Sequence, residues 1–240
     1  MLKITRKADV RSELEVCLKK FQEGDLGSLL SELNARLLQA KVKFPLLEYS
    51  ASELYRQIPE SHQRDLCDKV IELGTLGGNV IAGILLQKRL VNHFEESMDK
   101  AAQYIAQGEE WYVSDIIGER VHGWALLHHF TKALPVLQDR AGHPSPWVVR
   151  SIGAGSHYAI KKGLGPEQTE SVFRLLLSLA GAQDHAVKTG IGWAAKTAAK
   201  FHPEIVQRYK DEWEQSDRVG KWFRTKVNIG LKRYAHAQRD

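Results

Sequence analysis

The chain has 240 residues, of which 43% are hydrophobic and 26% charged, and its net charge is +5. This composition is typical of a soluble protein with a sizeable core and excludes an intrinsically disordered chain. The two cysteines, Cys17 and Cys67, lie 50 residues apart, which argues against a disulfide framework and against a thiolate zinc site.

The N-terminal segment lacks the apolar core of a signal peptide. The longest apolar stretch, residues 79–87, is far shorter than the ~20 residues that a membrane span requires. We therefore expect a soluble protein of the cytoplasm that has no contact with a membrane.

Along the chain, apolar residues recur at helical spacing and almost nowhere alternate with period two. Prolines open several of the runs, as in Ser145-Pro146 and Gly165-Pro166, and glycines such as Gly163 follow others. No strand is expected. The predicted helices span residues 8–21, 26–39, 46–57, 61–73, 78–90, 93–107, 112–130, 132–139, 146–162, 166–180, 185–200, 203–213 and 217–236.

The spacing of three residues distinguishes between two helical architectures, a globular bundle and a stacked solenoid. Trp111, Arg150 and Trp193 fall near the starts or inner faces of successive helices, 39 and 43 residues apart. HEAT-like units repeat every ~40–47 residues. The sequence therefore favours an all-α, HEAT-like helical-repeat solenoid: one domain over residues 1–240, a curved superhelix of antiparallel helix pairs with a concave binding face.

The basic charge is concentrated at the C-terminal end. Residues 181–240 contain 12 Lys and Arg against 7 Asp and Glu, which equals the whole net charge of +5. A localised basic excess favours a polyanionic partner, nucleic acid first, although a solvated basic surface gives the same count. The C-terminal run, residues 218–239, interleaves cations with aromatic residues and could follow a DNA backbone or close the end of the solenoid.

Four residues could form a site for cleavage of a glycosidic bond. Trp111 and Asp115 are four residues apart and share one helix face, and the inner-helix residues Arg150 and Trp193 are expected to converge on them. A carboxylate can stabilise an oxocarbenium-like sugar and position water. Indole faces attract a cationic base by ~0.5–2 kcal/mol each, and Arg150 could clamp a phosphate. Taken singly, each residue also fits a packing or ion-pairing role.

Cationic stripes accompany these residues on two of the predicted helices. His157 and Lys161 follow Arg150 at seven and eleven residues, while Lys196 and Lys200 follow Trp193 at three and seven residues. These spacings place each set on one helix face. The four residues His157, Lys161, Lys196 and Lys200 are therefore candidate DNA-binding residues, with a solvated charged face as the alternative.

Three segments resemble a known family: WYVSD at 111–115, PWVVR at 146–150 and VKTGIGWAAKTAAKFHPEIV at 187–206. They are similar to the DNA alkylation repair glycosylases built from HEAT-like repeats, the AlkD-like family, over residues 108–209 approximately. The resemblance implies a monofunctional glycosylase of base excision repair that is associated with the nucleoid and uses the concave face of the solenoid as its DNA-binding face. Such an enzyme releases cationic purines such as 3-methyladenine and 7-methylguanine from alkylated duplex DNA as a monomer, without a metal or other cofactor. It also implies that Asp115 is the catalytic carboxylate, that Trp111 and Trp193 contact the lesion nucleotide, and that Arg150 and Lys196 contact DNA.

The chain departs from the pattern of that family near its N-terminus. In KVKFPLLE, residues 41–48, Pro45 matches, but Lys41 and Glu48 stand where the family often has glycine and arginine. Thr189 stands where some members have lysine. These changes keep open a non-catalytic relative that binds branched or distorted DNA.

Other readings of the sequence receive less support. A helical-repeat scaffold for protein partners would explain the fold without the site. The histidines show no H-E-x-x-H pattern and no carboxylate placed to complete a metal site, so no metal is expected.

Overall fold

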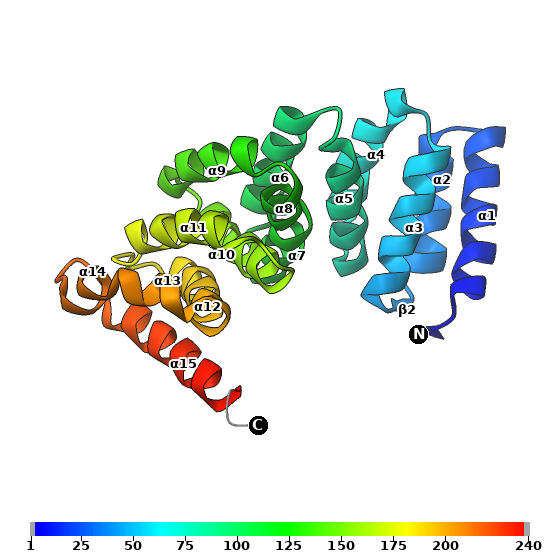
Figure 1. The fold of residues 1–240 in the computed structure, drawn as a ribbon. Helices are drawn as coiled ribbons and strands as arrows, with labels where there is room; N and C mark the ends of the chain where they lie inside the picture. The colour runs from blue at the N-terminus through cyan, green and yellow to red at the C-terminus, as the bar shows by residue number, and fades with distance from the viewer. Residues whose placement is uncertain (1–2, 238–240) are drawn as a thin grey trace. The chain divides into compact units, whose positions relative to one another are not determined.

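The computed structural model describes residues 3–237, and these are almost entirely helical (Figure 1). Residue contacts divide the chain between Tyr104 and Ile105 into two units. That residues 1–240 act as one repeat domain stays a prediction. Within residues 3–237, no helix combines the length and the apolar character needed to cross a bilayer.

The first unit is built from helices of about four turns. Two two-residue strands, β1 and β2, pair in parallel, with Lys3 opposite Lys41 and Ile4 opposite Val42. The prediction that the chain has no strands is wrong here, because a two-residue strand is too short to show a period of two. The elements are β1 (Lys3–Ile4), α1 (Lys7–Glu23), α2 (Leu26–Leu33), the π-helix η1 (Asn34–Leu38), β2 (Lys41–Val42), α3 (Phe44–Gln57), α4 (Glu60–Glu72), α5 (Leu76–Arg89) and α6 (Phe94–Gly108), which runs past the division.

The helices of the first unit pack in two rows. α1 contacts α3 and α3 contacts α5, while α2 contacts α4 and joins α1 across the rows. Fully buried leucines such as Leu14, Leu29, Leu54 and Leu66 fill the space between them. Burial of a leucine side chain contributes ~1.5–3 kcal/mol, so these positions hold the rows together.

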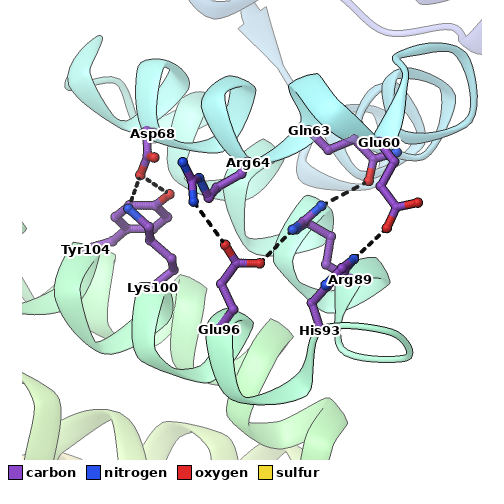
Figure 2. A network of polar contacts seen from close by, with 9 residues as sticks. All are labelled: Glu60, Gln63, Arg64, Asp68, Arg89, His93, Glu96, Lys100 and Tyr104. Atoms are coloured by element: carbon purple, nitrogen blue, oxygen red, sulfur yellow. Dashed lines mark hydrogen bonds and ion pairs between the residues drawn. The ribbon is translucent and has the colours of Figure 1, made fainter.

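A network of polar contacts joins α4 and α5 to α6 (Figure 2). Asp68 accepts hydrogen bonds of 2.7 Å from both Lys100 and Tyr104. Arg89, a buried residue of α5, donates to Glu96 over 2.7 Å. Because Asp68 and Glu96 each receive at least one charged donor, they remain satisfied at this packed junction, and the network has a structural role.

The second unit contains more and shorter helices. The predicted helix 112–130 is α7 (Trp111–Ile117), a π-helix η2 (Gly118–Gly123) and α8 (Trp124–His128), and the predicted helix 203–213 is α13 (Pro203–Arg208) and α14 (Lys210–Gln215). The other elements are α9 (Phe130–Asp139), the 3₁₀-helix η3 (Arg140–Gly142), α10 (Pro146–Lys161), α11 (Pro166–Ser178), α12 (His185–Phe201) and α15 (Lys221–Ala237).

Two rows of helices also form the second unit. In one row, α10 lies between the α7–η2–α8 segment and α12, and α15 packs on the far side of α12. In the other row, α11 contacts α9 and α13. Figure 1 shows α10, α12 and α15 following one another in this order. The row made of α7–η2–α8, α10, α12 and α15, called the first row below, carries every residue of the predicted site.

Glycines let the helices of the first row touch through their backbones. A Cβ atom on Gly153 of α10 would lie 2.2 Å from the carbonyl carbon of Gly190 on α12. A Cβ atom on Gly230 of α15 would lie 2.3 Å from the carbonyl oxygen of Lys196. Distances this short exclude any side chain, so the spacing of α10, α12 and α15 depends on these two glycines.

Candidate active site and nucleic-acid interface

The central feature of the second unit is an ion pair between Asp115 on α7 and Arg150 on α10. Arg150 Nε donates to Asp115 Oδ1 over 2.9 Å, and Arg150 Nη2 donates to Oδ2 over 2.8 Å. The two side chains are 16% and 8% exposed. A bidentate guanidinium fixes both the position and the plane of a carboxylate. The arrangement therefore presents a rigidly oriented, largely buried negative charge with a small opening to solvent.

The contacts beside this pair attach α7 to α10. Ser114, next to Asp115, donates from its hydroxyl to the carbonyl oxygen of Trp147 over 2.8 Å. One turn later, a Cβ atom on Gly118 would lie 3.0 Å from the carbonyl oxygen of Ser151. The π-helix η2 begins at Gly118, and π-turns inside helices frequently occur at functional sites. Contacts with α10 just before and just after Asp115 thus fix the position of the helix that carries it.

A buried histidine, His122, contacts Ser151, the residue that follows Arg150. The Arg140 guanidinium lies 3.1 Å from His122 Nε2 and can only donate, so Nε2 accepts and the ring proton is on Nδ1. Nδ1 therefore donates to the hydroxyl of Ser151 over 3.2 Å, and that hydroxyl donates to the carbonyl oxygen of Val148 over 2.6 Å. Burial, and then the Arg140 charge, lower the pKa of His122 to about 3. A neutral imidazole thus links η2 to the helix that carries Arg150.

The depressed pKa of His122 predicts a loss of stability in mild acid. The pKa of a histidine in an unfolded chain is ~6.5, whereas that of His122 in the folded chain is about 3. Between these two pH values, the unfolded chain binds a proton that the folded chain does not bind. The free energy of unfolding therefore falls as the pH falls through this window, by up to ~1.4 kcal/mol per pH unit from this group. Urea unfolding at pH 7, 6, 5 and 4 measures the slope.

The variant His122→Gln provides the comparison, because glutamine retains a donor and an acceptor but does not titrate. Its unfolding free energy should depend less steeply on pH than that of the wild type. His185→Gln, at an exposed position on the first turn of α12, is the matched control and should retain the wild-type slope. Identical slopes for wild type and His122→Gln would contradict the assignment.

Trp193 lies against a second histidine. The rings of His157 and Trp193 stack with centroids 3.9 Å apart and planes 25° from parallel. His157 Nδ1 lies 2.7 Å from the hydroxyl of Thr197, which itself donates to the carbonyl oxygen of Trp193 over 3.0 Å. The pKa of His157 is lowered to about 4, mainly by burial and then by the charges of Lys161 and Lys196. One face of the Trp193 indole is therefore covered by a neutral imidazole.

Four of the five predicted DNA-binding residues, all except Arg150, gather around this stack. They line a pocket of about 180 Å³ between α10, α12 and α15. Burial, and then the charges of Arg233 and Lys226, lower the pKa of Lys196, as expected where cations crowd together. The lining residues are His157, Lys161, Trp193, Lys196, Thr197, Lys200, Phe201 and Arg233.

Trp111 is the first residue of α7 and does not line this pocket. Its side chain is 57% exposed and lies edge-on to the neighbouring Tyr112, with ring centroids 5.9 Å apart. An indole this exposed does not fill a core, so the packing alternative does not describe it. Its ring is available to a ligand on the helix that carries Asp115, one turn away.

The structure and the sequence differ most at Arg150. The sequence pattern predicts that Arg150 clamps a phosphate, whereas in the structure its two-donor edge meets Asp115. The repeat spacing predicts that Arg150 lies near Asp115, but it does not show that the two side chains form an ion pair. The sequence pattern indicates the run 218–239 as a whole but does not single out Arg233, and it misses the His122–Arg140 contact. The seven-residue spacing of Lys226 and Arg233, which places both on one face of α15, was the available signal for Arg233.

No cluster of three or more His, Cys, Asp or Glu side chains suited to a metal ion occurs in the described part of the chain.

Comparison with known proteins bears directly on the fold. The sequence profile of the DNA alkylation repair enzyme family matches residues 42–222. The crystal structure of AlkD2 from Streptococcus mutans superposes with a TM-score of 0.70 at 14% identity, covering 86% of this chain and 97% of that one. Among curated proteins nothing matches. The structural likeness confirms the predicted all-α, HEAT-like fold.

Proposed function

Because the chain belongs to the DNA alkylation repair enzyme family, with an AlkD-like fold, we propose that it is a DNA glycosylase. It hydrolyses the N-glycosidic bond of cationic alkylated purines, of the 3-methyladenine and 7-methylguanine class, in duplex DNA. The observation that carries the proposal is the fixed carboxylate of Asp115, held by Arg150 one turn from the exposed indole of Trp111.

The chemistry proposed for Asp115 follows from its two hydrogen bonds. A carboxylate oxygen has two lone pairs, so each oxygen can accept a further hydrogen bond after Arg150 has taken one. When the alkylated base departs, the glycosidic electron pair neutralises its ring and the sugar becomes positively charged. The carboxylate stabilises this charge, orients water toward the anomeric carbon, and accepts the proton that the water loses.

Arg150 acts in this proposal as a positioning residue. Its guanidinium holds the carboxylate plane, and the Ser114–Trp147 hydrogen bond keeps the two helices in place. A carboxylate that is already oriented needs no reorganisation when charge develops on the sugar. The phosphate contacts that the sequence pattern predicts for Arg150 are assigned instead to the cations on α10 and α12.

The two tryptophans contribute in different ways. Trp111 offers a largely exposed indole to the cationic nucleotide, and each cation–π contact is worth ~0.5–2 kcal/mol. Trp193 can offer only the face that His157 leaves open, or its edge. We propose that Trp111 supplies most of the attraction to the positive charge, and that Trp193 with His157 forms a rigid wall beside the DNA.

A second candidate is a relative that binds branched or distorted DNA without releasing a base. One observation favours it: Asp115 is only 16% exposed and both of its oxygens already accept from Arg150. Lys41 and Glu48, which replace residues common in the family, point the same way.

Base release from methylated duplex DNA separates the two candidates. The protein is incubated with DNA treated with a methylating agent, the released bases are resolved by chromatography, and binding is measured on the same DNA. Glycosylase activity predicts free 3-methyladenine or 7-methylguanine above the level found with unmethylated DNA and with heat-denatured protein. Binding without release would establish the second candidate, and the absence of both would remove both.

A further inference from the structure

We infer that Lys161, Lys196, Lys200 and Arg233 form a pocket that holds one backbone phosphate of the DNA, and that the C-terminal helix α15 is thereby part of the DNA-binding surface. The inference rests on the proposal that the chain binds duplex DNA. It adds a contact on α15, a helix that lies after all three segments of the family resemblance.

The pocket is built from three helices whose spacing is fixed. Lys161 ends α10, Lys196 and Lys200 lie on α12, and Arg233 lies on α15. A Cβ atom on Gly230 would lie 2.3 Å from the carbonyl oxygen of Lys196, so the close backbone approach at this glycine sets the distance between α12 and α15. The packing of the helices therefore holds the backbones that carry these cations close together.

Within residues 3–237, the residues that line the pocket include no Asp or Glu to neutralise these cations. Elsewhere in the second unit, the guanidiniums of Arg150 and Arg208 each meet a carboxylate within 2.9 Å. Partial burial, and then the like charges of Arg233 and Lys226, lower the pKa of Lys196, so its charged form is held at a cost. An anion in the pocket would relieve this repulsion.

The position of the pocket suits a backbone phosphate close to the lesion. On α10, His157 and Lys161 follow Arg150 by seven and eleven residues, which is ~10 and ~16 Å at ~1.5 Å per residue. One strand of DNA rises ~3.4 Å per nucleotide. A strand that runs along α10 would place the phosphate in the pocket about three to five nucleotides from a sugar bound at Asp115.

The first experiment measures binding to an unmodified duplex by fluorescence anisotropy at several salt concentrations, with the full chain and Arg233→Gln. Losing one phosphate contact should weaken binding roughly tenfold at low salt and reduce the log–log salt slope by ~0.9. The matched control is Arg174→Gln, which removes the same charge from an exposed position on α11 in the other row of helices. It should leave the affinity and the slope close to wild type.

The second experiment locates the phosphate. Duplexes carry 7-methylguanine and one uncharged methylphosphonate, moved one nucleotide at a time, and binding is measured in an Asp115→Asn background so that the lesion is retained. With Arg233 present, affinity should fall at one or two neighbouring positions three to five nucleotides from the lesion. With Arg233→Gln added, the same substitutions should cost clearly less at those positions, because one of the four cationic contacts is already lost.

The outcomes keep this inference separate from the proposed function. Equal slopes for Arg233→Gln and Arg174→Gln, or a methylphosphonate pattern that Arg233→Gln leaves unchanged, would overturn the phosphate pocket while base release stands. The expected pattern in a protein that releases no base would support the pocket and overturn the glycosylase. A chain that binds no duplex would overturn both. Unchanged thermal unfolding confirms that both glutamine variants are folded.

Discussion

Asp115→Asn is expected to slow the release of 7-methylguanine from duplex DNA by ~10²–10⁴-fold, the range that a general acid–base group contributes. The amide keeps the size of the carboxylate and can still accept one of the two hydrogen bonds from Arg150, but it carries no negative charge for the sugar and accepts no proton from water. Single-turnover release from a duplex with one 7-methylguanine measures the change directly, because binding and product release are then separated from the chemical step.

The matched control is Asp139→Asn, an exposed carboxylate at the end of α9, and its rate should equal that of wild type. Asp115→Asn should bind the lesion duplex with an affinity close to wild type, since the contacts assigned to phosphate lie on other residues. A wild-type rate in Asp115→Asn would show that another group supports departure of the base.

Gly153→Ala is expected to lower the free energy of unfolding by ~3 kcal/mol or more, the upper range for overpacking a core. The new Cβ would lie 2.2 Å from the carbonyl carbon and oxygen of Gly190, and both are backbone atoms that cannot rotate away. Relief requires α10 to separate from α12. Because α10 carries Arg150 and α12 carries Trp193, base release should fall together with stability.

Urea unfolding of Gly153→Ala measures the loss, and Gly142→Ala is the matched control. A Cβ on Gly142, at the end of the η3 turn, meets no atom within 4 Å. Its effect should stay within ~0.5 kcal/mol, as for most surface substitutions. Equal unfolding free energies for the two variants would show that the backbone contact between α10 and α12 does not determine stability.

Sequence periodicity predicted the helices well where each is long and amphipathic. The predicted helices 146–162 and 185–200 match α10 and α12 to within one residue at each end. The π-helix η2 was missed because its buried residues continue the helical pattern of α7, and only the backbone hydrogen bonds distinguish it. The strand pair was missed because two residues show no period.

The candidate site was predictable only as far as its residues lie along single helices. The spacing of Trp193, Lys196 and Lys200 indicates a shared face, and all three line one pocket in the structure. The partner of Arg150 lies 35 residues away on another helix and depends on packing. The glycines at 153, 190 and 230 were the overlooked signal, since repeated glycines inside helices indicate close approach of neighbouring helices.

The proposed mechanism requires a positively charged leaving base, and one measurement tests that requirement directly. Base release is followed in two duplexes of the same sequence, one with 7-methylguanine and one with hypoxanthine, which is uncharged, at the same position. The Asp115-centred mechanism predicts release of 7-methylguanine and no measurable release of hypoxanthine. Release of both bases at similar rates, or of neither from duplexes that the protein binds, would contradict it.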